Sequence, residues 1–166
     1  MRIVVIAGPP CAGKTTFADL VAGPDDIVLD FDVIARELGS PVLWSHPEPW
    51  RSRAEADMQA AVRWAVLEPS GATAWVIRTA PRPRQRAELA ARWDAAVYLL
   101  NPGERECRRR ARADGRPAGT STSIGEWFSR YAPWIHDQDP GRLRPEWASP
   151  SPPVDRGIVC VDPRYV

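Results

Sequence analysis

The sequence predicts an α/β fold in which a five-stranded, mainly parallel sheet is flanked by helices. Two observations predict this fold. Short runs of branched apolar residues alternate along the chain with longer segments of helical periodicity. A glycine-containing loop directly joins the first of these runs, residues 3–7, to the first helical segment. Strands that alternate with helices favour a parallel sheet covered on both faces.

Five segments are expected as strands and six as helices. The predicted strands are residues 3–7, 27–31, 74–77, 95–100 and 157–161. The predicted helices are residues 14–22, 33–38, 51–67, 83–93, 104–113 and 123–134. Residues 40–50, which contain three prolines and two tryptophans, are expected as an ordered loop. Residues 136–156 are expected to be irregular.

Length and composition exclude several classes of protein. The chain has 166 residues, 44% of them hydrophobic, and a formal net charge of +1. This is enough apolar content for one buried core, so we expect a single domain over residues 1–166. The near-neutral charge argues against a protein that binds nucleic acid by electrostatics alone. Three widely spaced cysteines argue against a disulfide scaffold and favour the reducing cytoplasm.

The loop after the first strand has the composition of a phosphate cradle. Residues 8–15, Gly-Pro-Pro-Cys-Ala-Gly-Lys-Thr, match the Walker A (P-loop) pattern G-x-x-x-x-G-K-[ST] in its required place between a strand and a helix. Glycines let backbone N–H groups turn toward phosphate oxygens, and the following helix adds the positive end of its dipole. Lys14 is the single lysine among 22 basic residues. The pattern therefore predicts a nucleoside triphosphate site.

The loop supplies the expected contacts to ATP and Mg²⁺. Lys14 would reach the β- and γ-phosphates, and the Thr15 hydroxyl would ligate the metal. Cys11 is expected to serve as an inert small residue. The expected triphosphate-binding residues are Gly8, Pro9, Pro10, Cys11, Ala12, Gly13, Lys14, Thr15 and Thr16.

Two other classes of phosphate-loop protein are disfavoured. A switch GTPase needs a base-reading Asn-Lys-x-Asp segment, which a chain with one lysine used in the loop cannot contain. A motor-type ATPase is usually longer and places acids at the end of its third strand, where this chain has Arg78 and Thr79. Small kinases remain.

Four segments carry a resemblance to a known family. They are the loop at 8–16, Leu-Asp-Phe-Asp at 29–32 with Arg36 following, Arg-Thr-Ala-Pro at 78–81 with arginines after it, and the arginine-rich stretch 105–116 with residues 124–131 behind it. Together they resemble P-loop kinases of the polynucleotide-kinase and zeta-toxin type, within the nucleotide-kinase-like group of P-loop NTPases. The resemblance implies ATP- and Mg²⁺-dependent phosphoryl transfer and an arginine-rich lid over residues 103–122.

The resemblance also implies roles for particular residues. Asp32 is the expected general base, since ligands bind at the carboxyl ends of parallel strands. An N-cap on the helix from residue 33 is the structural alternative for Asp32. Asp30 is expected to support Mg²⁺. Arg109 and Arg112 are expected to be catalytic and Arg108 to bind the nucleotide, although such a run is more often a solvated basic face.

An insert over residues 33–72 is expected to bind the phosphoryl acceptor. Its mixture of cations and flat rings suits a base that carries phosphate. His46 in this insert is expected to be a hydrogen-bonding loop residue and not a catalyst. The expected acceptor-binding residues are Arg36, Trp44, Trp50 and Arg51 of the insert, together with Arg78.

These expectations favour an ATP-dependent kinase whose acceptor is a nucleic-acid 5′-hydroxyl, a preference that rests on the resemblance. A nucleoside or (deoxy)nucleoside-monophosphate kinase is one alternative. A non-kinase ATP-binding or ATPase module that switches a partner interaction is another, favoured by the missing acid after Ile77. No membrane partner is expected.

Overall fold

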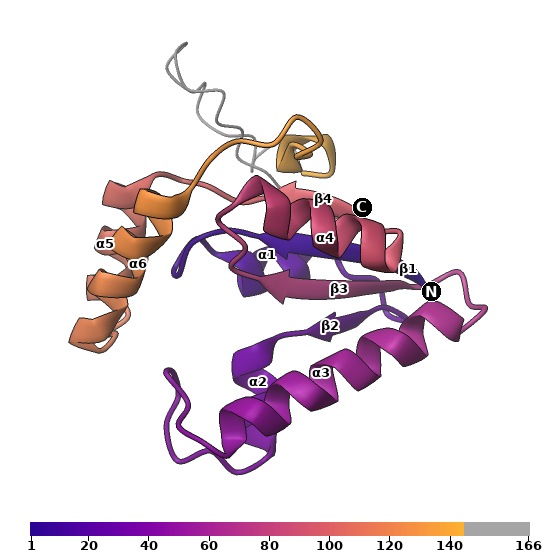
Figure 1. The fold of residues 1–166 in the computed structure, drawn as a ribbon, viewed down its shortest axis with the longest axis horizontal. Coiled ribbons are helices and arrows are strands. Elements are labelled where there is room, and N and C mark those ends of the chain that lie inside the picture. The colour runs from indigo at the N-terminus through magenta and orange to yellow at the C-terminus, as the bar shows by residue number, and fades with distance from the viewer. Residues whose placement is uncertain (145–166) are drawn as a thin grey trace.

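A four-stranded parallel sheet lies at the centre of the computed structural model, which describes residues 1–144 (Figure 1). The strand order is β2-β3-β1-β4, and all three pairings are parallel. The strands are β1 (Arg2–Ala7), β2 (Ile27–Leu29), β3 (Thr73–Arg78) and β4 (Ala96–Leu99). The α/β class and the parallel sheet are confirmed. The described sheet has four strands instead of five, and the strand expected at residues 157–161 lies outside the described residues.

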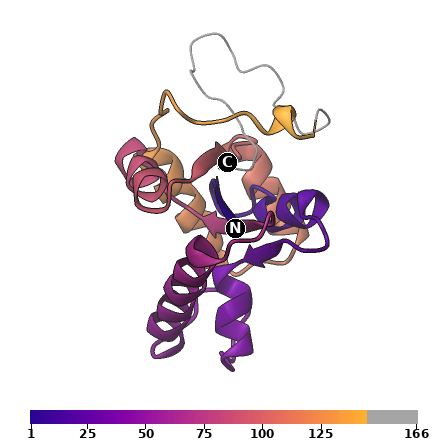
Figure 2. The same ribbon diagram turned by 90° about the vertical axis from the view of Figure 1, so that its right-hand side faces the viewer.

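Six α-helices surround this sheet in the described chain. They are α1 (Lys14–Val21), α2 (Phe31–Glu37), α3 (Trp50–Leu67), α4 (Pro83–Trp93), α5 (Glu104–Ala113) and α6 (Ala118–Arg130), followed by a 3-10 turn, η1 (Pro140–Arg142). The first and fourth helices pack on β1 from opposite faces of the sheet (Figures 1 and 2). The second and third helices pack against each other, as do the last two. None of the described helices is long and apolar enough to span a membrane.

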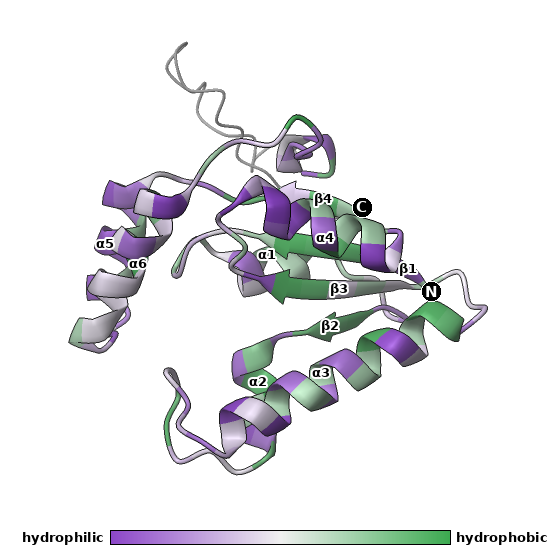
Figure 3. Ribbon diagram, in the orientation of Figure 1, coloured by the Kyte–Doolittle hydropathy of each residue, from purple (hydrophilic) through white to green (hydrophobic). Residues whose placement is uncertain are grey.

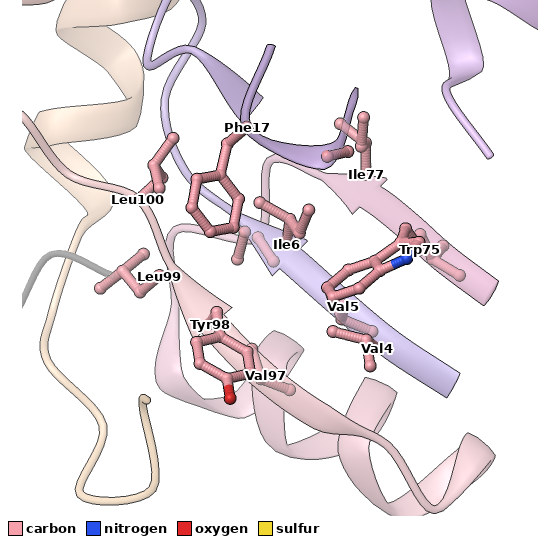
Figure 4. Packing of buried hydrophobic residues seen from close by; sticks show 14 of the residues in the cluster. Val4, Val5, Ile6, Phe17, Trp75, Ile77, Val97, Tyr98, Leu99 and Leu100 are labelled. Carbon is pink, nitrogen blue, oxygen red and sulfur yellow. The ribbon is translucent and has the colours of Figure 1, made fainter. Parts of the chain in front are cut away.

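The central strands form the hydrophobic core. Residues 3–7 of β1 and residues 73–77 of β3 are buried without the alternation of a half-exposed strand. Such continuous burial is typical of parallel strands covered on both faces. Figure 4 shows Phe17 of α1 pointing toward Ile6 of β1, and both side chains are fully buried. Figure 3 shows that these strands are hydrophobic, whereas α5 is hydrophilic along most of its length.

The junction between β2 and α2 differs from the expected one. The strand ends at Leu29, and the helix begins at Phe31 instead of residue 33. Asp30 is the N-cap, because its side chain accepts a hydrogen bond from the N–H of Asp32 at 2.9 Å. The alternative in which Asp32 caps the helix is therefore wrong, and the side chain of Asp32 is free for another role.

The sixth helix also has different bounds from those expected at residues 123–134. It begins at Ala118, directly after Pro117, and ends at Arg130. Pro133 explains the early end, because a proline disfavours the helical conformation of the residue before it. The residues that follow turn at 135–136 and reach the edge of the sheet, where Tyr98 of β4 forms a bridge with Gln138.

A buried ion pair holds this connection in place. The Arg86 side chain of α4 is 0% exposed and bonds both carboxylate oxygens of Asp137, at 2.7 and 2.8 Å. Its remaining N–H groups donate to the carbonyl oxygens of Ala80, Pro81 and Ala132. All five guanidinium donors are thus satisfied. The pair links the segment after β3, the end of α6 and the start of α4.

Replacing Arg86 with alanine is expected to lower the free energy of unfolding by about 3–5 kcal/mol, because it leaves the Asp137 carboxylate buried without a cation. Arg84→Ala on the same helix is the matched control. The Arg84 side chain is 88% exposed and pairs only at the surface with Glu88, so its loss should cost at most about 1 kcal/mol. Urea unfolding measures both. Equal losses in the two variants would show that burial of the pair is not what stabilises this segment.

Candidate active site

A cavity of about 660 Å³ opens at the carboxyl ends of the strands. This is the edge of a parallel α/β sheet at which ligands bind. The cavity is large enough for a small-molecule ligand. It is lined by residues 10–16 of the glycine loop, residues 30–32 after β2, residues 77–79 at the end of β3, Glu55 of α3, and Arg110, Asp114 and Arg116 of the expected lid.

Three backbone positions shape the glycine loop between β1 and α1. A Cβ atom at Gly8 would lie 2.3 Å from the carbonyl oxygen of Leu100, so only glycine fits between the loop and the end of β4. Gly13 precedes α1 with φ 94°, a left-handed conformation that glycine adopts without strain. Cys11 has φ 61° although it carries a side chain. The loop delivers the chain to the N-terminus of α1, where free N–H groups favour an anion.

The ammonium group of Lys14 lies beneath this loop. Its Nζ donates to the carbonyl oxygens of Gly8 at 3.0 Å and Pro9 at 2.8 Å, and the residue is only 9% exposed. Burial lowers the pKa of Lys14, while the nearby carboxylates, first that of Asp30, oppose the shift. A buried ammonium bonded only to carbonyl oxygens is poorly compensated. The arrangement fits a polyphosphate, which would supply the missing negative charge.

The Thr15 hydroxyl and the Asp30 carboxylate form a second polar pair in the cavity. Thr15 Oγ1 donates to Asp30 Oδ2 at 2.5 Å, and Asp30 is 8% exposed. The pair offers two oxygen atoms of the kind that Mg²⁺ prefers. No group of three His, Cys, Asp or Glu side chains suited to a metal occurs in the described chain. A magnesium ion would therefore need phosphate and water oxygens as further ligands, as this ion usually does.

Asp32 faces the same cavity from the first turn of α2. Its side chain is 44% exposed, and its Oδ1 lies 3.2 Å from Nε2 of the fully buried His46. Burial and the neighbouring Asp30 raise the pKa of Asp32, whereas His46 lowers it, and the net shift is upward. A carboxylate with a raised pKa is better suited to accept a proton. The structure therefore places the expected base next to the expected phosphate loop.

Arg78, at the end of β3, forms a bidentate ion pair with Glu55 of α3. The sequence has no acid at this end of the strand. Arg78 Nη1 and Nη2 donate to the Glu55 carboxylate at 2.8 and 3.0 Å. Burial raises the pKa of Glu55, but the hydrogen bonds from Arg78 and Gln59 outweigh it and the net shift is downward. The charge of Arg78 is therefore compensated before any ligand arrives.

Two arginines of the lid contact the site, and neither was singled out from the sequence. Arg110 Nη1 donates to the carbonyl oxygen of Ala12 in the glycine loop at 2.8 Å. The Arg116 guanidinium lies over the indole ring of Trp44, 4.1 Å from its centroid. Because both line the cavity, the lid touches the loop through Arg110 and the insert through Arg116.

The lid arginines chosen from the sequence lie elsewhere. Arg108 bonds to Glu104, and Arg109 bonds to Glu106 with its side chain 64% exposed. Arg112 is exposed, and none of the three lines the cavity. Their contact with a nucleotide stays a prediction. The buried residues Cys107 and Ala111 mark the inner face of α5, and this apolar pair is the signal that points to Arg110.

The expected acceptor-binding residues are only partly brought together. Of the five, Arg78 alone lines the cavity. Arg36 is exposed and donates to the carbonyl oxygen of Asp32, and Arg51 is exposed and pairs with Glu48. Trp44 is half-buried under Arg116, whereas Trp50 begins α3. The roles of these residues in binding stay predictions.

Comparisons with known proteins give distant likenesses. No protein-family model and no curated protein matches the chain. Shikimate kinase from Acinetobacter baumannii in complex with shikimate aligns with a TM-score of 0.48 and 18% identity, over 78% of this chain and 75% of that one. The Thermus thermophilus protein TT1252 aligns with a TM-score of 0.45 and 18% identity, over 78% of both chains. Neither likeness identifies the function of this chain, and the resemblance to the polynucleotide-kinase type stays a prediction.

Replacing Lys14 with methionine, which has a similar length and no charge, is expected to weaken binding of Mg·ATP by at least about 100-fold, because charge-assisted hydrogen bonds contribute about 1.5–3 kcal/mol each. Isothermal titration calorimetry measures the affinity. Arg84→Met is the control, because the Arg84 side chain is 88% exposed and does not line the cavity. It should bind within about threefold of the natural protein, since a difference of 1.4 kcal/mol is already tenfold. Unchanged affinity in the Lys14 variant would remove this ammonium from the binding site.

Proposed function

We propose that the protein is an ATP- and Mg²⁺-dependent kinase that transfers the γ-phosphoryl group to a hydroxyl group of a small molecule. One observation carries the proposal. A single cavity is lined by the buried cation Lys14, by the hydrogen-bonded pair of Thr15 and Asp30, and by the carboxylate of Asp32. Phosphoryl transfer needs these three components: a cation on the phosphates, oxygen ligands for the metal, and a group that orients or deprotonates the attacking hydroxyl.

Each of these groups has its own role in the proposed reaction. The loop N–H groups and Lys14 would hold the β- and γ-phosphates, and Thr15 with Asp30 would hold the metal. When bound, Mg²⁺ neutralises charge on the phosphate oxygens. Asp32 accepts the proton of the acceptor hydroxyl as its oxygen bonds to the γ-phosphorus. The bond from this phosphorus to the bridging oxygen breaks, and ADP leaves.

The charges near the acceptor side favour a small molecule over a nucleic-acid strand. Binding of a strand depends on cations along its phosphates and on exposed rings for its bases. Arg51 and Arg78 are already paired with Glu48 and Glu55. The ring of Trp44 is covered by a guanidinium group. The expectation of a nucleic-acid 5′-hydroxyl acceptor is therefore unsupported, whereas a nucleoside remains within the proposed class of acceptors.

A polar groove next to the cavity gives room for the rest of such an acceptor. It has a volume of about 300 Å³ and shares Glu55, Arg78 and Thr79 with the main cavity. Gln59 of α3 and Gln85 of α4 are among its other lining residues. Amide and carboxylate groups are suited to hydrogen bonds with hydroxyl groups. The groove therefore supports an acceptor that carries several hydroxyls.

The argument that favoured an ATPase module with a switching role no longer applies. That argument was the absence of an acid after Ile77 in the third strand. Asp30 bonds directly to the Thr15 hydroxyl, so the cavity contains a carboxylate in the place where the metal is expected. A separate third-strand acid is not required for the proposed metal site.

Incubation with labelled ATP and a panel of acceptors tests the function. The panel contains sugars, cyclitols, nucleosides, nucleoside monophosphates and 5′-hydroxyl oligonucleotides. We expect label to be transferred to one or more of the non-phosphorylated small molecules and not to the oligonucleotides. Transfer to oligonucleotides alone would contradict the proposed acceptor class. Release of free phosphate with every compound would favour the ATPase module instead.

Asp32→Asn is expected to lower kcat by at least about 100-fold, because a positioned acid–base group contributes about 10²–10⁴ in rate. The substituted side chain keeps its shape, so the affinity for Mg·ATP should stay within about twofold, less than 1 kcal/mol. Glu37→Gln is the control, since this exposed carboxylate lies at the end of the same helix and its loss should leave kcat unchanged. Full activity of the Asp32 variant would remove this residue from the mechanism.

A further inference from the structure

His46 occupies an unusual position in the loop between α2 and α3. Its side chain is 0% exposed, and it reaches back to Asp32 in the first turn of α2. The ring of Phe31 meets it edge to face, with 6.0 Å between the ring centroids. A buried imidazole is unfavourable unless both of its nitrogen atoms find polar partners. The partners of these two nitrogens therefore indicate why a histidine is present.

The two ring nitrogens face two different side chains. Nδ1 lies 2.8 Å from Ser40 Oγ, within hydrogen-bonding distance. Nε2 lies 3.2 Å from Asp32 Oδ1 but makes no well-aligned hydrogen bond. Contacts of this kind are often poorly aligned in an unliganded site and tighten when substrate binds. His46 does not line the cavity, so any influence on the reaction passes through Asp32.

The chemistry of these groups selects one arrangement of protons. An ionised carboxylate can only accept hydrogen bonds, so Nε2 must carry a proton when Asp32 is ionised. Nδ1 of a neutral imidazole is then an acceptor, and the Ser40 hydroxyl can donate to it. The hydrogen bonds therefore run in one direction: Ser40 donates to His46, and His46 donates to Asp32 Oδ1.

This arrangement leaves the second carboxylate oxygen of Asp32 for the acceptor hydroxyl. In the described structure, His46 is the only side chain within ion-pair distance of the Asp32 carboxylate. The Asp32 side chain is 44% exposed, so without this partner it could leave the orientation that the reaction needs. A misplacement of about 1 Å in a catalytic group can cost about 100-fold in rate.

We propose that His46, held by Ser40, is a positioning residue that orients the Asp32 carboxylate toward the acceptor hydroxyl. This inference rests on the proposed kinase function. A purely structural role for His46 predicts something different: its replacement would lower stability and would affect turnover equally whether or not Asp32 is present. The two roles are therefore separable by experiment.

The first test does not depend on activity. Nitrogen NMR reports which imidazole nitrogen carries the proton, and the chain has only two histidines, His46 and His136. A His136→Gln variant assigns the signals. At mildly alkaline pH we expect a proton on Nε2 and none on Nδ1 of His46, and a changed Nδ1 signal in Ser40→Ala. A proton on Nδ1, or a mixture like that of the exposed His136, would overturn the proposal.

The second test is a double-mutant cycle on the transfer rate. His46→Phe should lower kcat by up to about 100-fold with the KM for ATP unchanged, and His46→Gln should retain part of the activity because its amide can donate. In the Asp32→Asn background His46→Phe should cause no further loss, since coupled residues are not additive. An equal factor in both backgrounds would overturn the proposal.

If the His46→Phe variant does not fold, the Ser40→Ala variant takes its place in the measurement of kcat. It should give a smaller loss of kcat than His46→Phe with the KM for ATP unchanged, and an unchanged kcat would contradict the hydrogen-bonded chain from Ser40 to Asp32. The failure of the proposed function is distinguishable, because natural protein that transfers phosphate to no acceptor would still give a decisive NMR result for His46.

Discussion

The cleft is organised around one buried ammonium group, that of Lys14. An ammonium taken out of water is stable only where oxygen atoms replace its hydration. The carbonyl oxygens of Gly8 and Pro9 do so directly, and the carboxylate of Asp30 adds opposite charge nearby. The two carbonyl groups belong to the glycine loop, whereas Asp30 is the N-cap of α2. The loop is anchored because it follows β1, an inner strand of the sheet, and because Gly8 packs against the backbone of Leu100.

The other charged groups around Lys14 differ in how they are paired. Arg78 is paired with Glu55, so Lys14 is the buried cation of the cavity that has no carboxylate bonded to it. The carboxylate of Asp30 is committed to Thr15 and to the start of α2. The carboxylate of Asp32 also lines the cavity, and its one ion-pair partner in the described structure is His46. In the proposed reaction, Asp32 is therefore the carboxylate that accepts the proton of the hydroxyl group.

Local patterns in the sequence were sufficient to locate the four described strands and the glycine loop with Lys14 at its end, because each depends on a few consecutive residues. The N-cap was placed two residues late, since Phe31 extends the apolar run of β2 but belongs to α2. The choice among the lid arginines failed to find Arg110, because it considered the charges of α5 and not the apolar pair of Cys107 and Ala111, which marks the inner face of the helix. The contact between His46 and Asp32 depends on the path of an irregular loop, which no sequence periodicity encodes.

Two contacts at the cleft join residues that are far apart in the sequence. Arg110 joins the lid to Ala12, and Arg116 joins the lid to Trp44 of the insert. A cation–π contact of this exposure contributes about 0.5–2 kcal/mol, and a single hydrogen bond to a charged group about 1.5–3 kcal/mol. The two arginines therefore tie the segment around α5 to both the glycine loop and the insert. The cleft is thus built from two kinds of contact: backbone and side-chain groups fixed by the ends of the parallel strands, and long arginine side chains that reach in from outside the sheet.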